Sequence, residues 1–264
     1  MIDGELTTYG ILGVGALGEA IVTGLCQDVD DAPPVVLSPR SEATAGALAQ
    51  AHPSVRVAGS NQEVVDASTV VVACLRQGDV GVLAGLDWRP NHVVVSAVAG
   101  LGGSALADAV APASLVARAV PMPAVARRGW ATPVRPPVPA AMVLFERLGG
   151  AIPIESDEQY DAIFTGLGTV APFFDYLDTI AEFLIDHGLP ESAARRLVSS
   201  SFAGVVEPLG HPDVLGFAEL LRAHATPDGG NDQLATLMRE AGVPEATRHS
   251  LDEVYRRQTG APLP

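Results

Sequence analysis

The sequence predicts an α/β domain with a doubly wound parallel sheet, followed by an all-helical domain. Two observations predict the first domain: short apolar runs alternate with amphipathic helical stretches through residues 9–154, and these runs are almost continuously apolar. Strands of that kind are covered on both faces by crossover helices. A third observation predicts the second domain, because from residue 155 onward only helical periodicity remains. We therefore expect one domain over residues 1–154 and another over residues 155–264.

Six runs rich in Val, Ile and Leu predict the first strands of the sheet. They cover residues 9–12, 34–37, 55–57, 69–75, 92–98 and 114–120. Amphipathic stretches between them predict helices near residues 17–27, 42–51, 61–66, 79–86 and 103–110. Ser60 and Glu63 have the spacing of a capping box, which places the start of the third helix.

The stretch 121–139 is rich in proline and interrupts this alternation. Proline lacks the N–H group that a central strand or a helix interior requires. We expect this stretch to be a loop over the end of the sheet. A helix over residues 142–149 and a last strand over residues 151–154 follow it.

Helical periodicity runs through residues 157–166, 171–187 and 191–206, and then through shorter segments to about residue 258. The segment 171–187 is apolar on more than one face. A helix of that kind is usually buried on several sides. A second copy of the chain is one source of this cover, so we expect a dimerisation domain.

Composition excludes several classes of function. The chain has 264 residues, of which 48% are hydrophobic, yet no apolar run reaches the about 18–20 residues that cross a bilayer. The polar, acidic N-terminus does not resemble a signal peptide, so a cytoplasmic protein is expected. The formal net charge of −15 argues against nucleic acid or an anionic membrane surface as the main partner.

Residue usage also excludes particular chemistries. All 16 basic residues are arginines, so no lysine is present to form a Schiff base or to bind phosphate in a P-loop. The two cysteines, Cys26 and Cys74, lie in apolar segments and are expected to be core residues. The six histidines are scattered without metal-ligand spacing, so no metal site is expected.

The segment 9–25 reads YGILGVGALGEAIVTGL, with glycines in a G-x-G-x-x-G pattern between a strand and a helix. This context is the one that a Rossmann-type dinucleotide-binding domain requires. We expect the turn and the helix N-terminus to hold a pyrophosphate, and the contacting residues to be Gly13, Gly15, Ala16, Leu17 and Gly18. The alternative is a strand–helix turn with small packing residues.

The end of the second strand distinguishes NAD from NADP. NAD sites place a carboxylate there to bind the ribose 2′-hydroxyl. Here the chain has Ser38 and Arg40, with no acidic residue before Glu42. A hydroxyl and a guanidinium suit a 2′-phosphate, so we expect NADP(H) as the cofactor. The alternative is that Arg40 is a solvated turn residue.

Several segments in order resemble the pyrroline-5-carboxylate reductase family, over nearly the whole chain. The residues that carry the resemblance are 9–25, 70–80 (VVVACLRQGDV), 96–101 (SAVAGL), 118–121 (RAVP), 144–168 (LFERLGGAIPIESDEQYDAIFTGLG), 187–190 (HGLP) and 211–237. The resemblance implies hydride transfer from C4 of a nicotinamide to the C=N carbon of a cyclic imine. It also implies a homodimer or higher homo-oligomer built through the C-terminal helices, with the substrate pocket between the two domains.

The resemblance implies further cofactor contacts at the ends of the fourth and fifth strands. These residues are Cys74, Leu75, Arg76, Ala97 and Val98, with Arg76 standing where the family usually has lysine. For the substrate it implies contacts from Met122, Thr169, Thr226, Gly229, Gly230, Asn231 and Asp232. Thr169 and Thr226 are the candidate polar groups for the catalytic step.

The sequence departs from the family where the substrate is expected. Met122 and Pro123 replace an asparagine and a threonine, and Asn231 and Asp232 replace paired threonines. A carboxylate beside Asp232 would be repelled, so a neutral or cationic imine would bind more readily. Alternatively, Asn231 and Asp232 are an N-cap pair. The competing functions are a reductase for a different imine or carbonyl and a non-catalytic nucleotide-binding homologue.

Overall fold

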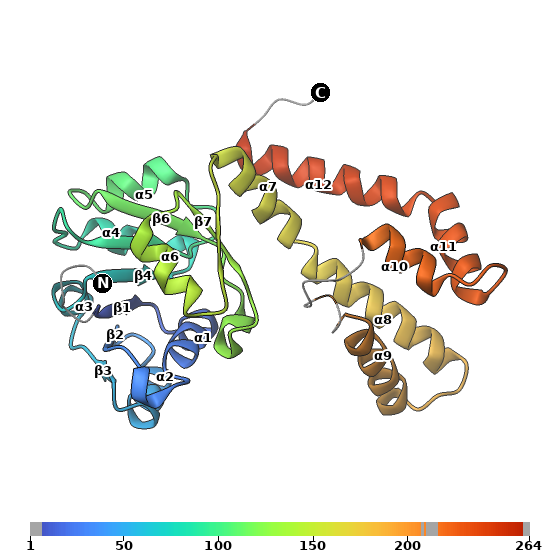
Figure 1. The fold of residues 1–264 in the computed structure, drawn as a ribbon, viewed down its shortest axis with the longest axis horizontal. Helices are drawn as coiled ribbons and strands as arrows, with labels where there is room; N and C mark the ends of the chain where they lie inside the picture. The colour runs from blue at the N-terminus through green and yellow to red at the C-terminus, as the bar shows by residue number, and fades with distance from the viewer. Residues whose placement is uncertain (1–6, 207–208, 210–215, 261–264) are drawn as a thin grey trace. The chain divides into compact units, whose positions relative to one another are not determined.

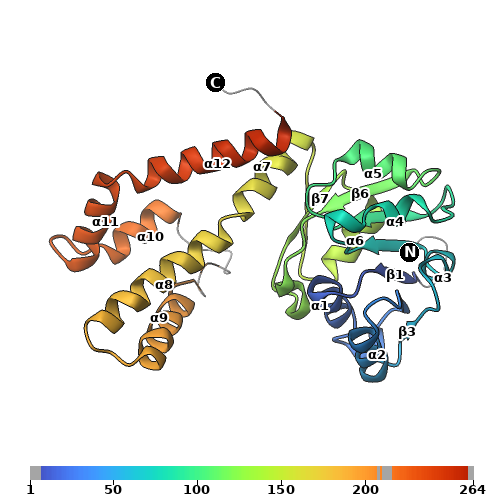
Figure 2. The same ribbon diagram turned by 180° about the vertical axis from the view of Figure 1, so that it is seen from behind.

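The computed structural model describes residues 7–206, 209 and 216–260 of the chain. It divides into two compact units, Met1–Ile163 and Phe164–Pro264 (Figure 1). The first unit contains the sheet with its helices, and the second is built from helices, as the view from behind also shows (Figure 2). The division falls within helix α7 (Asp157–Leu167).

An eight-stranded sheet forms the centre of the first unit, in the order β3-β2-β1-β4-β5-β6-β7-β8. The strands are β1 (Tyr9–Leu12), β2 (Val35–Leu37), β3 (Val55–Val57), β4 (Val70–Ala73), β5 (Val93–Ser96), β6 (Leu115–Ala119), β7 (Thr132–Arg135) and β8 (Ala151–Pro153). Neighbouring strands pair in parallel, except that β6 and β7 are antiparallel. The chain winds outward from β1 in one direction and then from β4 in the other, so the predicted doubly wound α/β fold is confirmed.

Helices and 3-10 turns connect these strands, and most start within a few residues of the predicted positions. They are α1 (Ala16–Leu25), η1 (Val29–Asp31), α2 (Glu42–Ala51), α3 (Asn61–Asp66), η2 (Gln77–Asp79), α4 (Gly81–Ala84), α5 (Gly103–Ala109), η3 (Pro123–Arg127) and α6 (Pro139–Glu146). At the start of α3, the Glu63 N–H donates to Ser60 Oγ at 3.1 Å. The Glu63 carboxylate accepts from the N–H of Gly59 at 2.8 Å, one residue earlier than a standard capping box.

Alternate residues of the central strands β1, β2, β4 and β5 enter separate cores on the two faces of the sheet. On one face Ile11, Val70 and Val72 pack with helices α1, α2 and α6. On the other face Leu12 and Val71 pack with helices α3, α4 and α5. Both faces are therefore buried, which explains why the strands are continuously apolar in sequence.

The expectation that residues 121–139 form a loop was wrong. Strand β7 lies within this stretch and pairs with both β6 and β8. Pro133 in its middle cannot donate, but its carbonyl accepts from the N–H of Val120 at 3.1 Å. Proline content concealed the strand because the sequence does not show which backbone groups a neighbouring strand will use.

All the regular elements that the structure describes in the second unit are helices, as expected. After the end of α7, its helices are α8 (Val170–Asp186), α9 (Glu191–Val206), α10 (Phe217–His224), α11 (Gly230–Glu240) and α12 (Val243–Thr259). Helix α8 is not buried on several sides within one chain, since Phe174 and Phe183 remain 62% and 60% exposed. Among the described helices, none has the length and apolar character needed to span a membrane.

Two glycines in adjacent helices provide a test of this packing. A Cβ at Gly24 in α1 would lie 2.3 Å from the carbonyl oxygen of Val125, whereas a Cβ at Gly46 in α2 would meet nothing within 4 Å. We expect Gly24→Ala to lower the free energy of unfolding by about 1–3 kcal/mol through overpacking. Urea unfolding followed by circular dichroism measures the change.

Gly46→Ala is the matched control for this substitution. It should leave stability unchanged or raise it by about 0.5–1 kcal/mol, because alanine is the better helix former. Equal effects of the two substitutions would contradict the close contact between α1 and η3.

Candidate functional site

The glycine turn after β1 is shaped by close backbone contacts. Gly13 has φ +95°, and a Cβ on it would lie 2.5 Å from the carbonyl oxygen of Cys74. A Cβ on Gly18 would lie 2.3 Å from the carbonyl oxygen of Gly13. Both positions therefore require glycine for the folding of the protein itself.

Gly15 differs from the other two glycines of the turn. Its φ is −83°, which any residue can adopt, and a Cβ on it would meet nothing within 4 Å. The protein's own packing therefore does not require glycine here, and the open space on Gly15 lets a ligand approach the backbone. Ala16 and Leu17 follow as the first residues of α1, whose N-terminal N–H groups form a favourable environment for an anion.

Ser38 at the end of β2 is buried, with only 1% of its surface exposed. Its Oγ accepts a hydrogen bond of 3.0 Å from the N–H of Gly13. In this structure the Ser38 hydroxyl therefore supports the glycine turn by accepting a hydrogen bond. The sequence could not show this contact, because it joins residues 25 positions apart.

Arg40 lies two residues further on and is exposed. Its Nη1 atom is 2.9 Å from Oδ2 of Asp79, which ends the η2 turn after β4. Since β1 lies between β2 and β4, this ion pair connects the loops on either side of the glycine turn. Arg40 is therefore not a purely solvated turn residue, and its cation lies at the edge of the sheet where a dinucleotide is expected.

The ends of β4 and β5 complete this edge. The N–H of Cys74 donates to Leu12 at 2.8 Å, and the N–H of Ala97 donates to Ala73 at 2.9 Å. Burial raises the pKa of the Cys74 thiol to about 12, so this cysteine stays a neutral thiol and is not a nucleophile. Val98 is buried beside Ser96, whose Oγ accepts its N–H at 3.2 Å.

The structure thus brings all the predicted cofactor-binding residues to the carboxyl edge of the sheet. They follow β1 (Gly13, Gly15, Ala16, Leu17 and Gly18), β2 (Ser38 and Arg40), β4 (Cys74, Leu75 and Arg76) and β5 (Ala97 and Val98). In doubly wound sheets, ligands bind at this edge where the chain reverses direction, here between β1 and β4.

The predicted substrate-binding residues are divided between the two units. Met122 lies in the first, half-buried, at the start of η3. Thr169 precedes α8 in the second unit, and its Oγ1 donates to the carbonyl of Gly166 at 2.8 Å. Thr226 is exposed, and its carbonyl accepts from the N–H of Gly229 at 2.9 Å. The two threonines therefore each bond within their own turn.

Asn231 and Asp232 lie in the first turn of α11, next to Gly230. The Asn231 amide donates to the carbonyl of His224 at 3.1 Å, and Oδ2 of Asp232 accepts from the N–H of Asp228 at 3.3 Å. The N-cap residue itself is Gly229. Both side chains therefore stabilise the preceding turn, although neither is the N-cap residue.

A buried arginine network was not assigned a role from the sequence. The Arg118 side chain is 8% exposed, and its guanidinium lies 2.7 Å from Asp157 and 3.7 Å from Asp161. It also lies 4.2 Å from the ring centroid of Tyr160, and Arg135 is 3.2 Å from Asp157. The signal was available: an arginine stands inside the apolar run SLVARAV. The network connects β6 and β7 to the first turns of α7.

Tyr160 within this network is a structural phenol. Burial raises its pKa to about 12, against the opposing charge of Arg118. The hydroxyl stays protonated at neutral pH and donates to the carbonyl of Ala119 at 3.3 Å. Together with the ion pairs of Arg118, this bond positions α7 against the sheet.

Comparisons with known proteins agree with this geometry. A family described as "NADP oxidoreductase coenzyme F420-dependent" matches residues 8–100. A pyrroline-5-carboxylate reductase of Mycobacterium tuberculosis is 26% identical over 271 aligned residues, covering 90% of each chain. The family resemblance is confirmed. Both the matching family and this relative are oxidoreductases.

Solved pyrroline-5-carboxylate reductases share the fold. The enzyme from Streptococcus pyogenes has a TM-score of 0.78 at 20% identity and covers 97% of this chain and 99% of its own. The Plasmodium falciparum pyrroline carboxylate reductase, solved with NADP bound, has a TM-score of 0.75 at 14% identity and covers 96% of this chain and 97% of its own. Both contain a Rossmann-type sheet unit and a helical unit, as this chain does.

Substituting the glycines of the turn separates folding from binding. We expect Gly15→Ala to leave the midpoint of thermal unfolding unchanged, because the added methyl meets no protein atom. It should weaken dinucleotide binding by about tenfold or more, since the methyl occupies the path of the pyrophosphate. Fluorescence titration measures the binding.

Gly13→Ala provides the comparison. This substitution should lower the midpoint of thermal unfolding, since it combines a positive φ with a contact of 2.5 Å to Cys74. If Gly15→Ala bound the dinucleotide as tightly as the unaltered protein, the glycine turn would not be the pyrophosphate site.

Proposed function

We propose that the protein is an NADP(H)-dependent reductase of the C=N bond of a cyclic imine. The observation that carries the proposal is the opening at Gly15, in a chain that matches a pyrroline-5-carboxylate reductase over 90% of its length. A nucleotide-binding turn alone is compatible with many reactions. The likeness along both units supports the imine as the hydride acceptor.

The residues of the carboxyl edge fit the proposed cofactor. The open backbone at Gly15 and the first turn of α1 would hold the pyrophosphate, and Arg40 would hold the 2′-phosphate. Bound nicotinamide supplies the hydride. The protein's own contribution is to position the two reactants, because a protonated imine needs orientation and electrostatic stabilisation more than a strong acid.

Electrostatics favours NADP(H) over NAD(H). The chain carries a formal net charge of −15, so an anionic ligand depends on local cations. Arg40 supplies one at the end of β2, where an NAD site would have a carboxylate. The first acidic residue after the strand is Glu42, which begins α2.

Cofactor titration tests this preference. We expect NADPH to bind about tenfold or more tightly than NADH, because the 2′-phosphate gains a charge-assisted bond to Arg40. Arg40→Ala should remove most of the difference by weakening NADPH alone. Tighter binding of NADH by the unaltered protein would contradict the proposed cofactor.

A second candidate function is favoured by Asp232. Its carboxylate is half-buried in the turn whose family counterpart carries threonines, so a substrate carboxylate there would be repelled. The substrate would then be an imine, or a carbonyl compound, without a carboxylate. Assays of NADPH oxidation with pyrroline-5-carboxylate and with uncharged pyrroline and piperidine imines distinguish the two. Tight NADPH binding without turnover of any of them would favour a non-catalytic role.

Substitution of Asp232 tests its effect on substrate choice. We expect Asp232→Thr to raise kcat/KM for pyrroline-5-carboxylate by about tenfold relative to an uncharged imine, because a repulsive charge is removed. Asp232→Asn is the control that removes the charge but retains the shape. If both variants left the ratio of the two substrates unchanged, Asp232 would not select the substrate.

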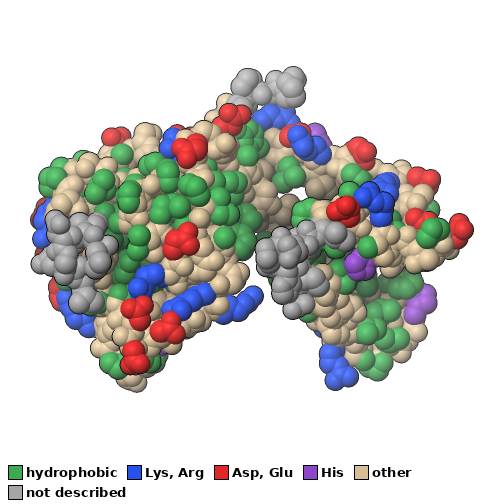
Figure 3. All heavy atoms as spheres, viewed as in Figure 1, with side chains coloured by type: hydrophobic (Ala, Val, Ile, Leu, Met, Phe, Trp, Pro, Cys, Tyr) green, Lys and Arg blue, Asp and Glu red, His purple; other side chains and the backbone are tan. Residues whose placement is uncertain are grey.

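We also propose that the protein is a homodimer through its helical unit. Among the described residues of that unit, only Thr165, Ala181, Ala194 and Val198 are buried. A unit of this size needs a larger core than four residues provide. Apolar side chains are exposed on it instead, as the green surface in Figure 3 shows.

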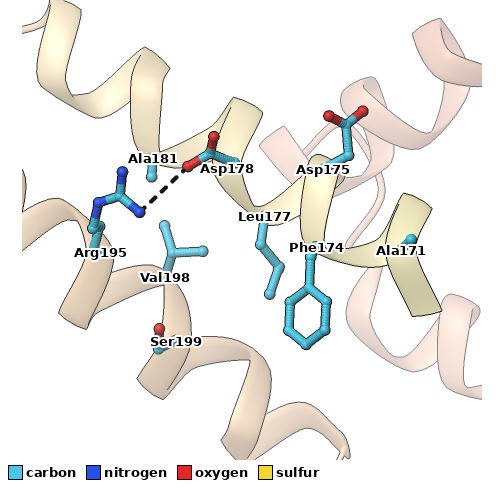
Figure 4. A pocket seen from close by; sticks show the side chains of 9 residues that line it. All are labelled: Ala171, Phe174, Asp175, Leu177, Asp178, Ala181, Arg195, Val198 and Ser199. Carbon is cyan, nitrogen blue, oxygen red and sulfur yellow. Dashed lines mark ion pairs between the residues drawn. The ribbon is translucent and has the colours of Figure 1, made fainter.

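An open groove lies between α8 and α9 in this unit (Figure 4). Its volume is about 640 Å³, and the lining includes Phe174, Leu177 and Val198, with Asp178 and Arg195 paired at 3.6 Å across it. Five of the nine residues that line this groove are apolar. A second copy of the same helices would supply the apolar cover that the single chain lacks.

The oligomeric state tests this proposal. We expect sedimentation to give twice the mass of one chain, and the paired change Phe174→Asp with Phe183→Asp to produce monomers. Val143→Asp is the control, since Val143 is 55% exposed on α6 of the first unit. A monomeric unaltered protein would contradict the proposed dimer.

A further inference from the structure

The Arg40–Asp79 ion pair lies beside the glycine turn, and binding of a cofactor by Arg40 does not explain it. Arg40 follows β2, Asp79 follows β4, and β1 with its glycine turn lies between these strands. The two side chains meet at 2.9 Å, with Arg40 68% exposed and Asp79 29% exposed. The cation that would bind a 2′-phosphate therefore already has an anionic partner.

We propose that Asp79 is a specificity-determining residue that limits the preference for NADP(H), because it competes with the 2′-phosphate for Arg40. This inference rests on the proposed cofactor site. It assigns a function to a residue after β4, whereas the choice between NAD and NADP is usually read from the end of β2 alone.

Geometry makes Arg40 the partner that changes position. The N–H of Asp79 donates to the carbonyl of Arg76 at 2.9 Å within η2, and its side chain is more than two-thirds covered. Arg40 is on a loop and is more than two-thirds exposed. A phosphate must therefore either displace Arg40 from Asp79 or share the guanidinium with it.

Both possibilities lower the affinity for a 2′-phosphate. An exposed ion pair is weak, so a phosphate dianion can displace Arg40 from Asp79. Breaking the pair, however, uses part of the free energy of phosphate binding. If the guanidinium is shared, its five donors can serve both anions, but the phosphate and the carboxylate then repel each other. Neither cost applies to NAD(H), which has no 2′-phosphate.

The test is calorimetric titration of Asp79→Asn with adenosine 2′,5′-bisphosphate and with AMP. We expect the variant to bind the bisphosphate about two- to fivefold more tightly and AMP unchanged, because Arg40 is released from its partner. NADPH and NADH should follow the same pattern. Asp108→Asn on α5 makes the same change in net charge and should affect neither ligand.

A double substitution tests whether Asp79 affects phosphate binding through Arg40. In an Arg40→Ala background, Asp79→Asn should no longer raise the affinity for the bisphosphate. Arg40, for which Asp79 and the 2′-phosphate compete, is then absent. Persistence of the gain in that background would overturn the inference. Weaker binding of the bisphosphate by Asp79→Asn would also overturn it, since Asp79 would then be holding Arg40 in place for the phosphate.

These titrations are independent of the proposed reaction. If the bisphosphate binds and responds as expected but no imine is reduced, the reaction fails and the assignment of Asp79 stands. If imines are reduced and Asp79→Asn has no effect on the bisphosphate, the assignment fails and the reaction stands. If neither the bisphosphate nor NADPH binds, both the cofactor site and the role of Asp79 are refuted.

Discussion

The close backbone contacts around the turn after β1 are the constraint on which the candidate site depends. Gly13 is held from two sides, by the Ser38 hydroxyl at 3.0 Å and by the backbone of Cys74, while Gly18 packs against the Gly13 carbonyl. These contacts join the ends of β1, β2 and β4 into one edge. The open side of Gly15 and the start of α1 face outward as a consequence, and a dinucleotide would bind to a preformed surface.

Two arginines of this acidic protein, Arg118 and Arg40, differ in burial and therefore in what their charges can do. Arg118 is nearly inaccessible and is held by two carboxylates and an aromatic ring, so removing both carboxylates would leave an uncompensated buried charge. Such a group is suited to holding α7 on the sheet. Arg40 is itself exposed and has one carboxylate partner, so it can exchange that partner for a ligand. The same residue type is therefore structural in β6 and available for recognition after β2.

The helical unit presents the opposite situation from the sheet unit. The strands bury both faces of the sheet within one chain, whereas α8 leaves Phe174 and Phe183 more than half exposed. The helical unit exposes more apolar residues than solvated helices usually do. Too few of its apolar residues are covered to form an independent core. The proposed second chain would account for both facts, and it would connect the stability of this unit to the oligomeric state.

The sequence by itself determined the doubly wound sheet, the positions of its helices and the location of the glycine turn. These features are local, because periodicity and residue spacing record which faces are buried. It also identified the residues after β1, β2, β4 and β5 that share one edge. Only the tertiary structure decided what those residues contact.

Four examples show this limit. Ser38 bonds to Gly13, Arg40 pairs with Asp79, Arg118 is buried by α7, and Pro133 lies inside a strand. Each depends on a partner from a distant part of the chain. Periodicity reports that a residue is buried or exposed, but a hydrogen bond or an ion pair depends on distances that are set only when the strands come together.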